Sequence, residues 1–171
     1  MNDIILVDEN DKKIGEGEKM DVHEKGKLHR AFSIFIFNNK SELMLQKRVA
    51  VKYHSPNLWS NTCCSHPRPG EKTLDGAIRR LKEEMGFNCS LEELLSFIYE
   101  VKFSNGLTEN EYDHVFVGEY NDKPNLNLNE ASDWKWVDLE DLEKDIRKNP
   151  ENYTHWLKLC LNKLISATTS D

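Results

Sequence analysis

An amphipathic helix between two sets of strand-like segments constrains the fold of this chain more than any other feature. Residues 73–85 carry apolar side chains at helical spacing, and Gly86 supplies a stop. Strand-like segments precede this helix, and further strands and then two more helices follow it. This order favours an α/β (α+β) fold, with a mixed sheet and helices on its faces. A chain of 171 residues is long enough for one such domain with its own core, over residues 1–171.

The expected strands are short and separated by polar turns. Residues 31–37 and 42–48 are apolar runs on either side of the turn Asn-Asn-Lys-Ser, which predicts a β-hairpin. The other expected strands are residues 4–7, 97–103, 111–120 and 134–137.

Two helices are expected near the end of the sequence. Asp138 can cap the first, with Leu142 on its apolar face. The second is expected to begin at Asn149-Pro150, because a capping residue followed by proline is typical of a helix start. Residues 166–171 are expected to fray. The apolar face of the last helix would contain Trp156, Leu157, Cys160, Leu161, Leu164 and Ile165.

Charge and hydropathy argue against several classes of partner. The net charge of −7 gives a nucleic-acid role no support, because phosphate-backbone binding normally needs a basic excess. The longest apolar run, near residues 32–37, is too short to span a bilayer. The N-terminal sequence lacks the basic-then-apolar order of a signal peptide. We therefore expect a cytoplasmic protein with no nucleic-acid partner and no membrane contact.

The chain has four cysteines, and two of them are adjacent. A reducing compartment does not favour a disulfide framework, and neighbouring cysteines are poorly placed to bridge each other. Cys89 and Cys160 are interpreted as core residues. For Cys63-Cys64, a metal site, a nucleophile and the core remain open.

Histidines and a pair of glutamates could form a metal site. His23 and His29 lie in VHEKGKLHRAF, His66 follows the cysteine pair, and Glu109 and Glu111 form Glu-Asn-Glu at a strand start. Alternate residues of a strand point to one face, so both carboxylates could reach one ion. Imidazoles with carboxylates suit an ion of the Mn, Zn or Fe kind. From the residues alone, surface histidines with a solvated acidic pair are the other interpretation.

The segment GEKTLDGAIRRLKEEMGF resembles a Nudix box, G-x5-E-x7-R-E-U-x-E-E-x-G-U, whose helical glutamates hold Mg²⁺ against a diphosphate. We align Gly76 with the first glutamate of the pattern and Arg80 with the glutamate after its arginine. A missing carboxylate weakens Mg²⁺ binding of the hydrolytic kind. The box therefore favours diphosphate binding over hydrolysis. The residues taken as matches are Gly70, Arg79, Leu81, Glu83, Glu84, Gly86 and Phe87.

With Asn-Thr-Cys-Cys-Ser-His-Pro, the Glu-Asn-Glu pair and the histidines of VHEKGKLHRAF, the altered box resembles type 1 isopentenyl-diphosphate delta-isomerases, over about residues 6–156. That family interconverts isopentenyl and dimethylallyl diphosphate in isoprenoid biosynthesis, by protonation and deprotonation through a carbocation-like intermediate. The resemblance implies a Nudix-type mixed sheet flanked by helices, with metal ligands from the N-terminal segment 1–30. It also implies a small-molecule diphosphate substrate, and we expect a monomer or weak homodimer.

The resemblance assigns the proton transfers to Cys64 and Glu111. It places Tyr99 in a hydrogen bond with Glu111 and the Trp156 indole near the cationic carbon of the substrate. Cys63 is interpreted as a packing residue, because neighbouring strand residues point to opposite faces. A cation near a thiol favours ionisation, which would let Cys64 act as a base. Which of the two groups protonates the substrate stays open.

Two ions are implied. Mg²⁺ would bind Glu84 together with the substrate diphosphate, and one Mn²⁺ or Zn²⁺ would occupy a His/Glu site. The interval between the first two histidines is one residue shorter than in some members of the family. The other histidines, His54, His114 and His155, match no ligand position. The ligands implied for the Mn²⁺ or Zn²⁺ site are His23, His29, His66, Glu109 and Glu111.

The anionic substrate needs cations, and the resemblance supplies four. Arg80, which departs from the hydrolase pattern, becomes a phosphate ligand, because guanidinium binds phosphate through paired hydrogen bonds. The implied substrate-binding residues are Lys19, Arg48, Lys52 and Arg80.

Two other functions remain open. A Nudix pyrophosphohydrolase would cleave a nucleoside diphosphate or another diphosphate. A binding module would use the histidines and the Glu-Asn-Glu pair for a structural metal, closed by protein ligands.

Overall fold

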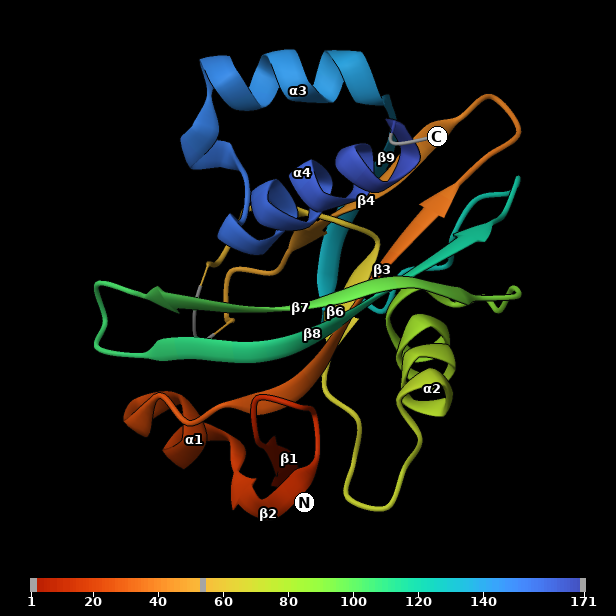
Figure 1. Cartoon of the computed structure of the whole chain (residues 1–171). Coiled ribbons are helices and arrows are strands. Elements are labelled where there is room, and N and C mark those ends of the chain that lie inside the picture. The colour runs from red at the N-terminus through yellow and green to blue at the C-terminus, as the bar shows by residue number, and fades with distance from the viewer. Residues whose placement is uncertain (1–2, 53–54, 170–171) are drawn as a thin grey trace.

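In the computed structural model, which describes residues 3–52 and 55–169, one curled mixed sheet lies at the centre with helices around it (Figure 1). Within those residues the sheet has nine strands, and four α-helices accompany it. In chain order the elements are β1 (Asp3–Val7), β2 (Lys13–Glu18), α1 (Lys19–Lys25), β3 (His29–Phe37), β4 (Glu42–Arg48), β5 (Trp59–Ser60), β6 (Cys63–Ser65), α2 (Thr73–Met85), β7 (Glu92–Lys102), β8 (Thr108–Glu119), β9 (Ala131–Asp138), α3 (Leu139–Lys148), a 3₁₀ turn (Pro150–Asn152) and α4 (His155–Thr169).

Strand β3 organises the sheet. Along one edge it pairs in parallel with β8, from His29 opposite Glu111 to Phe37 opposite Glu119. Strand β8 in turn pairs antiparallel with β7. Along its other edge β3 meets β1, β6 and β4 in succession, and β4 then leaves to pair with β9 and β5. Segments distant in sequence therefore meet around the two ends of β3.

Alternation along β3 divides the core into two clusters. Phe32 and Ile34 pack in one cluster with Leu81 of α2, and Phe35 packs in the other with Leu157 of α4. Successive strand residues point to opposite faces, so a continuous apolar strand can bury both. Helix α2 thus covers one face of the sheet and α4 covers the other, as the α+β prediction requires (Figure 1).

Most of the expected elements are confirmed. The helix at 73–85 has the predicted bounds, and Gly86 ends it in the left-handed conformation, at φ 76°. The hairpin of β3 and β4 is confirmed next to its turn, where Phe37 pairs with Leu43, and beyond that the strands diverge because β6 pairs with β3. Asp138 caps α3 by accepting hydrogen bonds from the amides of Glu140 and Asp141.

The predicted start of the last helix is wrong. Pro150 opens only a short 3₁₀ turn, and α4 begins at His155. Between them Tyr153 forms a β-bridge with Trp59, and the Thr154 amide donates to the Trp59 carbonyl. These contacts keep residues 153 and 154 extended, so the helix begins only after them. At the other end, the expected frayed tail is helical through Thr169, and residues 170–171 lie outside the described part.

Two elements near the N-terminus, β2 and α1, were not predicted. Helix α1 is a seven-residue helix in which only Val22 and His23 are buried, so it has no apolar periodicity to reveal it. Glu18 caps it by accepting from the Asp21 amide, and Gly26 ends it in the left-handed conformation, at φ 66°. Nothing among the described helices is both long enough and apolar enough to cross a membrane.

Candidate active site

Three histidines and a glutamate converge where β3 and β8 begin. His23 comes from α1, His29 from the start of β3, His66 from the segment after β6 and Glu111 from β8. Their ligand atoms all lie within 4.8 Å of one another. The Nε2 atoms of His29 and His66 lie 3.3 Å and 3.2 Å from Glu111 Oε2. This donor set suits a divalent transition metal better than Ca²⁺.

The surroundings of these histidines also fit metal binding. The Nδ1 atoms of His23 and His29 lie 2.7 Å and 2.9 Å from the carbonyl oxygens of Lys19 and Lys27. A backbone carbonyl on the outer ring nitrogen is the usual partner of a metal-binding histidine. Burial lowers the pKa of His23, and it lowers the pKa of His66 to about 3. Neutral imidazoles, the form that coordinates metal, are therefore favoured.

Tyr99 connects the two carboxylates of the Glu-Asn-Glu segment. Its hydroxyl donates to Glu111 Oε1 at 2.7 Å, so the expected hydrogen bond is confirmed, and it also bonds Glu109. Burial and the neighbouring charge of Glu111 raise the pKa of Glu109 well above its ordinary value. Glu109 is not one of the four closely spaced groups, although Tyr99 connects it to Glu111, and its assignment as a metal ligand stays a prediction.

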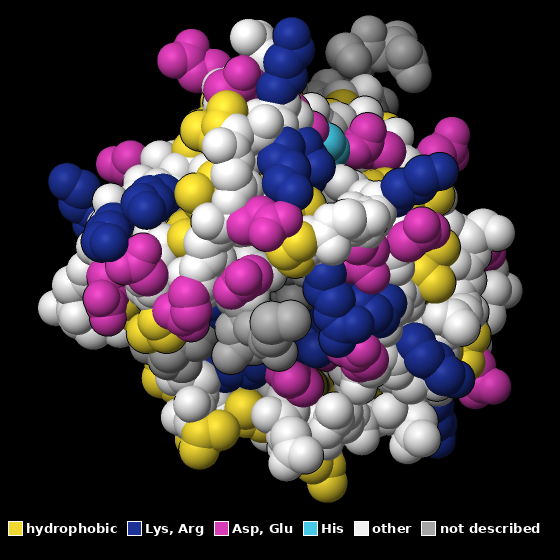
Figure 2. All heavy atoms as spheres, turned by 90° about the horizontal axis from the view of Figure 1, so that it is seen from below, with side chains coloured by type: hydrophobic (Ala, Val, Ile, Leu, Met, Phe, Trp, Pro, Cys, Tyr) yellow, Lys and Arg dark blue, Asp and Glu magenta, His cyan; other side chains and the backbone are white. Residues whose placement is uncertain are grey.

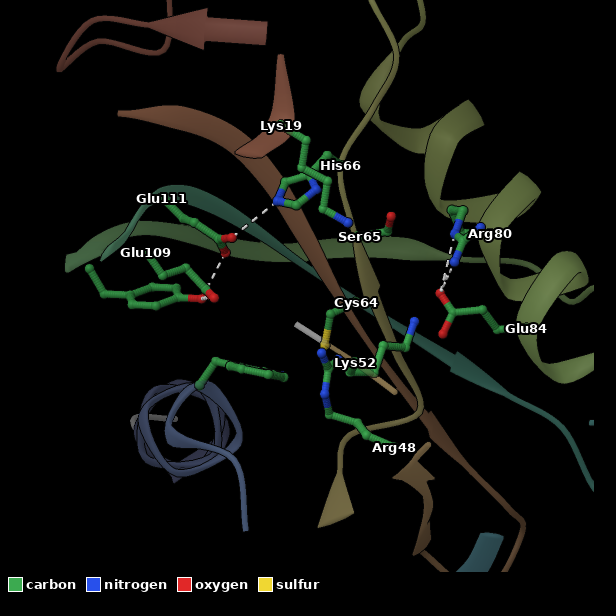
Figure 3. Close-up of a pocket in the computed structure, with 12 residues that line it drawn as sticks. Lys19, Arg48, Lys52, Cys64, Ser65, His66, Arg80, Glu84, Glu109 and Glu111 are labelled. Carbon is green, nitrogen blue, oxygen red and sulfur yellow. Dashed lines mark hydrogen bonds and ion pairs between the residues drawn. The ribbon is translucent and has the colours of Figure 1, made fainter. Parts of the chain in front are cut away.

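One pocket opens beside the cluster and brings the predicted residues together (Figure 3). Among the residues implied by the resemblance, only His23 and His29 are not part of its lining, and they belong to the histidine cluster instead. Ser65 also lines the pocket and was not predicted, because alternation along a strand would turn it away from Cys64 and His66. The lining residues are Lys19, Arg48, Lys52, Cys64, Ser65, His66, Arg80, Glu84, Tyr99, Glu109, Glu111 and Trp156.

The surroundings of Cys64 in this pocket favour the neutral thiol. Its Sγ lies 3.1 Å from Asn61 Oδ1, which can accept the S–H. Burial, followed by the charge of Asp113, raises the pKa of Cys64 far above its ordinary value, and Arg48 offsets this only in part. The expected ease of ionisation is therefore wrong for this structure, because desolvation outweighs the nearby cation.

Cys63 points the other way, as alternation predicts. It is fully buried in the core cluster beneath α2. It also contacts a pocket residue from the core side, because its Sγ lies 3.3 Å from Glu84 Oε2. All four cysteines are free.

Cations gather around the pocket in a protein with a net charge of −7. Burial and the charges of Lys52, Arg80 and Arg48 lower the pKa of Lys19. Such mutual repulsion arises where cations crowd one another, and an anion relieves it. Glu130 offsets part of this positive charge. It forms ion pairs with Lys52 and with Arg80, whose Nη2 lies 3.3 Å from Glu130 Oε1. Lys and Arg side chains also gather on the face shown in Figure 2.

The indole ring of Trp156 contacts a positively charged side chain in this structure. The Arg48 guanidinium carbon lies 5.0 Å from the centroid of the indole, within the range of a cation–π contact. The indole Nε1 donates to Ser60 Oγ at 2.9 Å, and Trp156 is 2% exposed. The ring is thus fixed in the pocket wall.

The remaining histidines lie away from the cluster or outside the described residues. His114 bonds Asp11, at 2.9 Å, and Glu93, and His155 is exposed on α4. His54 lies outside the described residues.

The alignment of Gly76 with the first glutamate of the Nudix box is wrong. The pattern places seven residues between that glutamate and the arginine, and Glu71 precedes Arg79 with that spacing. Glu71 accepts two hydrogen bonds from Arg79, at 2.8 Å and 2.9 Å. A Cβ at Gly76 would lie 2.8 Å from Glu71 Oε1 and 3.2 Å from the Pro67 backbone, so a side chain at position 76 would displace the glutamate that pairs with Arg79. The match of Gly70 is wrong for the same reason, because the first glycine of the pattern falls at Ser65, and the departures from the box are Ser65 and Arg80.

Solved structures similar to this chain support the fold. DR0079 from Deinococcus radiodurans has a TM-score of 0.79 at 22% identity, over 94% of this chain and 98% of that one. The MutT protein from Methanosarcina mazei Go1 has a TM-score of 0.69 at 17% identity, over 84% and 96%. Both show the shared fold.

Sequence comparison gives the family. Residues 27–157 match the NUDIX domain. The chain is 58% identical over 163 residues to isopentenyl-diphosphate Delta-isomerase 2 of Aromatoleum aromaticum, covering 95% of this chain and 86% of that protein. It is 44% identical over 164 residues to isopentenyl-diphosphate Delta-isomerase of Pectobacterium atrosepticum, covering 96% and 92%. The chain therefore belongs to the isopentenyl-diphosphate Delta-isomerase family, on a NUDIX domain.

Proposed function

We propose that this protein is an isomerase that interconverts isopentenyl diphosphate and dimethylallyl diphosphate, a reaction of isoprenoid biosynthesis. One observation carries the proposal: a single pocket holds a thiol, two carboxylates hydrogen-bonded to one tyrosine, and a group of cations. Acid–base groups and an anion site are the parts that this substrate requires.

The reaction moves a carbon–carbon double bond by one position. A proton is added at one carbon and another is removed from a different carbon, so two positioned acid–base groups are needed. Cys64 and Glu111 come from different strands and line the same pocket. We assign the two proton transfers to them. Because the reaction is reversible, the group that donates in one direction accepts in the other.

Tyr99 and Trp156 support this chemistry in different ways. The Tyr99 hydroxyl holds Glu111 Oε1, which fixes the direction of the carboxylate. Trp156 can stabilise a tertiary carbocation through its ring, an effect worth roughly 0.5–2 kcal/mol. Its hydrogen bond to Ser60 keeps the ring in place.

The diphosphate binds to Lys19, Arg48, Lys52 and Arg80 in this proposal. Glu84 holds Mg²⁺ there, and such an ion neutralises phosphate charge. At the histidine cluster we propose one Mn²⁺ or Zn²⁺, which would orient the Glu111 carboxylate. His23, His29 and His66 hold that ion with Glu111, and Glu109 is a further ligand.

Incubation with isopentenyl diphosphate and Mg²⁺ tests the proposal. Dimethylallyl diphosphate should form, and no phosphate should be released. Pyrophosphate or phosphate release without isomerisation would favour a Nudix hydrolase instead. Arg80 opposes that alternative, because it replaces a carboxylate of the box and pairs with Glu83 and Glu84.

The pocket also argues against a purely structural metal. A structural site is normally closed by protein ligands, whereas His66 and Glu111 both line an open pocket. We further propose that the protein acts in the cytoplasm as a monomer or weak homodimer. Light scattering across a range of protein concentrations tests the oligomeric state.

A further inference from the structure

Glu84, the residue proposed to hold Mg²⁺, is a buried carboxylate held from two sides. It is 4% exposed and lies on α2. Its Oε2 accepts from Arg80, at 2.8 Å and 3.2 Å. A carboxylate at this depth needs donors on both oxygens, because a buried oxygen without a hydrogen bond is costly.

Gln46 supplies the donor for the other oxygen. It lies on β4, is 3% exposed, and its Nε2 donates to Glu84 Oε1 at 3.1 Å. The same amide nitrogen donates to the carbonyl oxygen of Thr62 at 2.8 Å. Both partners can only accept, so the amide nitrogen, with its two N–H groups, must face them.

Cys63 adds a weak donor to the oxygen that Arg80 also contacts. Its Sγ lies 3.3 Å from Glu84 Oε2, and it is fully buried. Gln46 and Cys63 are both neutral, so they restrain the carboxylate without cancelling its charge. Arg80 already shares that charge, and a second cation in the place of Gln46 or Cys63 would neutralise it further.

We propose that Gln46 is a positioning residue for the Mg²⁺-binding carboxylate, with Cys63 as its weaker companion. Gln46 anchors Oε1 in the core, while Oε2 lies between Cys63 and Arg80, and Figure 3 shows Arg80 and Glu84 facing each other at the pocket. The inference rests on the proposed Mg²⁺ site at Glu84. Loss of an outer partner of a metal ligand typically costs 10–100-fold in metal affinity.

Gln46→Met tests this role, because methionine has a similar size and no N–H groups. Stabilisation by Mg²⁺ with inorganic pyrophosphate is measured as a melting-temperature shift across a Mg²⁺ titration, which needs no turnover. We expect the half-saturating Mg²⁺ concentration to rise about tenfold. In the isomerase assay the same rise should appear, and excess Mg²⁺ should restore most of kcat. Metal content at the histidine cluster should not change.

Thr62→Val is the matched control. Thr62 is buried in the same region, and its hydroxyl bonds the Met44 carbonyl at 2.6 Å and the Ile36 amide at 3.0 Å. Valine keeps the backbone carbonyl that accepts from Gln46, so this variant should lose stability without any change in the half-saturating Mg²⁺ concentration. If both variants shift that concentration equally, or if neither does, Gln46 is not a positioning residue.

Cys63→Ala keeps the proposal testable should Gln46→Met not fold. It removes the weaker donor, so a rise of about two- to threefold is expected, which corresponds to the lower end of hydrogen-bond contributions. No rise would overturn the companion role, and with an unfolded Gln46→Met it would overturn the whole proposal. A wild-type protein with the Mg²⁺ shift but no isomerase product would contradict the proposed function and leave this inference intact.

Discussion

Cys64 is the side chain whose replacement tests the proposed chemistry most directly. Cys64→Ala removes one of the two proton-transfer groups, and general acid–base groups typically contribute about 10²–10⁴-fold to rate. We expect kcat to fall by about that factor, while the circular dichroism spectrum and the melting temperature stay close to wild type. Steady-state isomerase kinetics give the measurement.

Cys89→Ala is the matched control for Cys64→Ala. Cys89 is partly buried against the core cluster under α2 and does not line the pocket. It should keep the wild-type kcat. Equal loss in both variants would mean that cysteine replacement in general, rather than the pocket thiol, lowers the rate.

Several residues of the site could be predicted from the sequence, and others could not. Cys64, Glu111 and Tyr99 follow from motifs of a known family. Gln46 gave no signal, because its role depends on a partner 38 residues away in sequence. The raised pKa of Cys64 was also not predicted, because the sequence shows a nearby positive charge but not the burial that outweighs it.

At the scale of elements, the short helix α1 positions the side chains of Lys19 and His23 at the site. Gly26 ends this helix at φ 66°, and a Cβ there would lie 3.2 Å from Thr108. Gly26→Ala should therefore lower metal retention at the histidine cluster, because left-handed backbone costs roughly 1–2 kcal/mol in other residues. Metal content after gel filtration measures this.

Gly106→Ala provides the comparison for Gly26→Ala. Gly106 has φ 88° and nothing within 4 Å of a built Cβ, so it has the backbone strain without the crowding. It lies in the turn between β7 and β8, two residues before Thr108, so it tests backbone strain near α1 without a new side chain against the end of that helix. This variant should lose stability but retain metal. Equal metal loss in both would show that α1 geometry is not the cause.

The ion pair between Glu71, in the loop that leads into α2, and Arg79 should contribute less to the free energy of unfolding at low pH. Hydrogen bonds from Arg79 hold the pKa of Glu71 below its ordinary value. This pair therefore stabilises the fold above the ordinary glutamate pKa, and the contribution is lost as pH falls through the lowered value. Glu71→Gln should cost about 1–2 kcal/mol at pH 7 and less at pH 3. Urea unfolding at both pH values measures the difference, and an equal cost at both would contradict it.

The elements that sequence analysis identified are those with a local period. Helix α2 has apolar residues at helical spacing, and its bounds are confirmed. Helix α1 is too short and too polar to show a period. The start of α4 was placed too early, because the pairing of Tyr153 with Trp59 is a long-range contact that no local pattern contains.

On the scale of the whole molecule, a metal ion at the histidine cluster would connect α1, β3, the segment after β6, and β8. Ions that bind only the folded state stabilise it by about 2.7 kcal/mol at a hundred times Kd. Treatment with a chelator should therefore lower the melting temperature and speed hydrogen exchange in α1. His23→Ala should remove most of the response to added Mn²⁺ or Zn²⁺, and an unchanged response would contradict the assigned ligand.

The parallel pairing of β3 with β8 has a consequence for folding order. His29 and Glu111 are 82 residues apart, and they become neighbours only when this pairing has closed. Contacts so distant in sequence form slowly, because a long loop must close first. The metal site therefore comes together late, after local turns and helices have formed. During refolding, binding of an ion by this cluster would therefore follow the closing of the sheet, and its rate would measure the last steps to the native state.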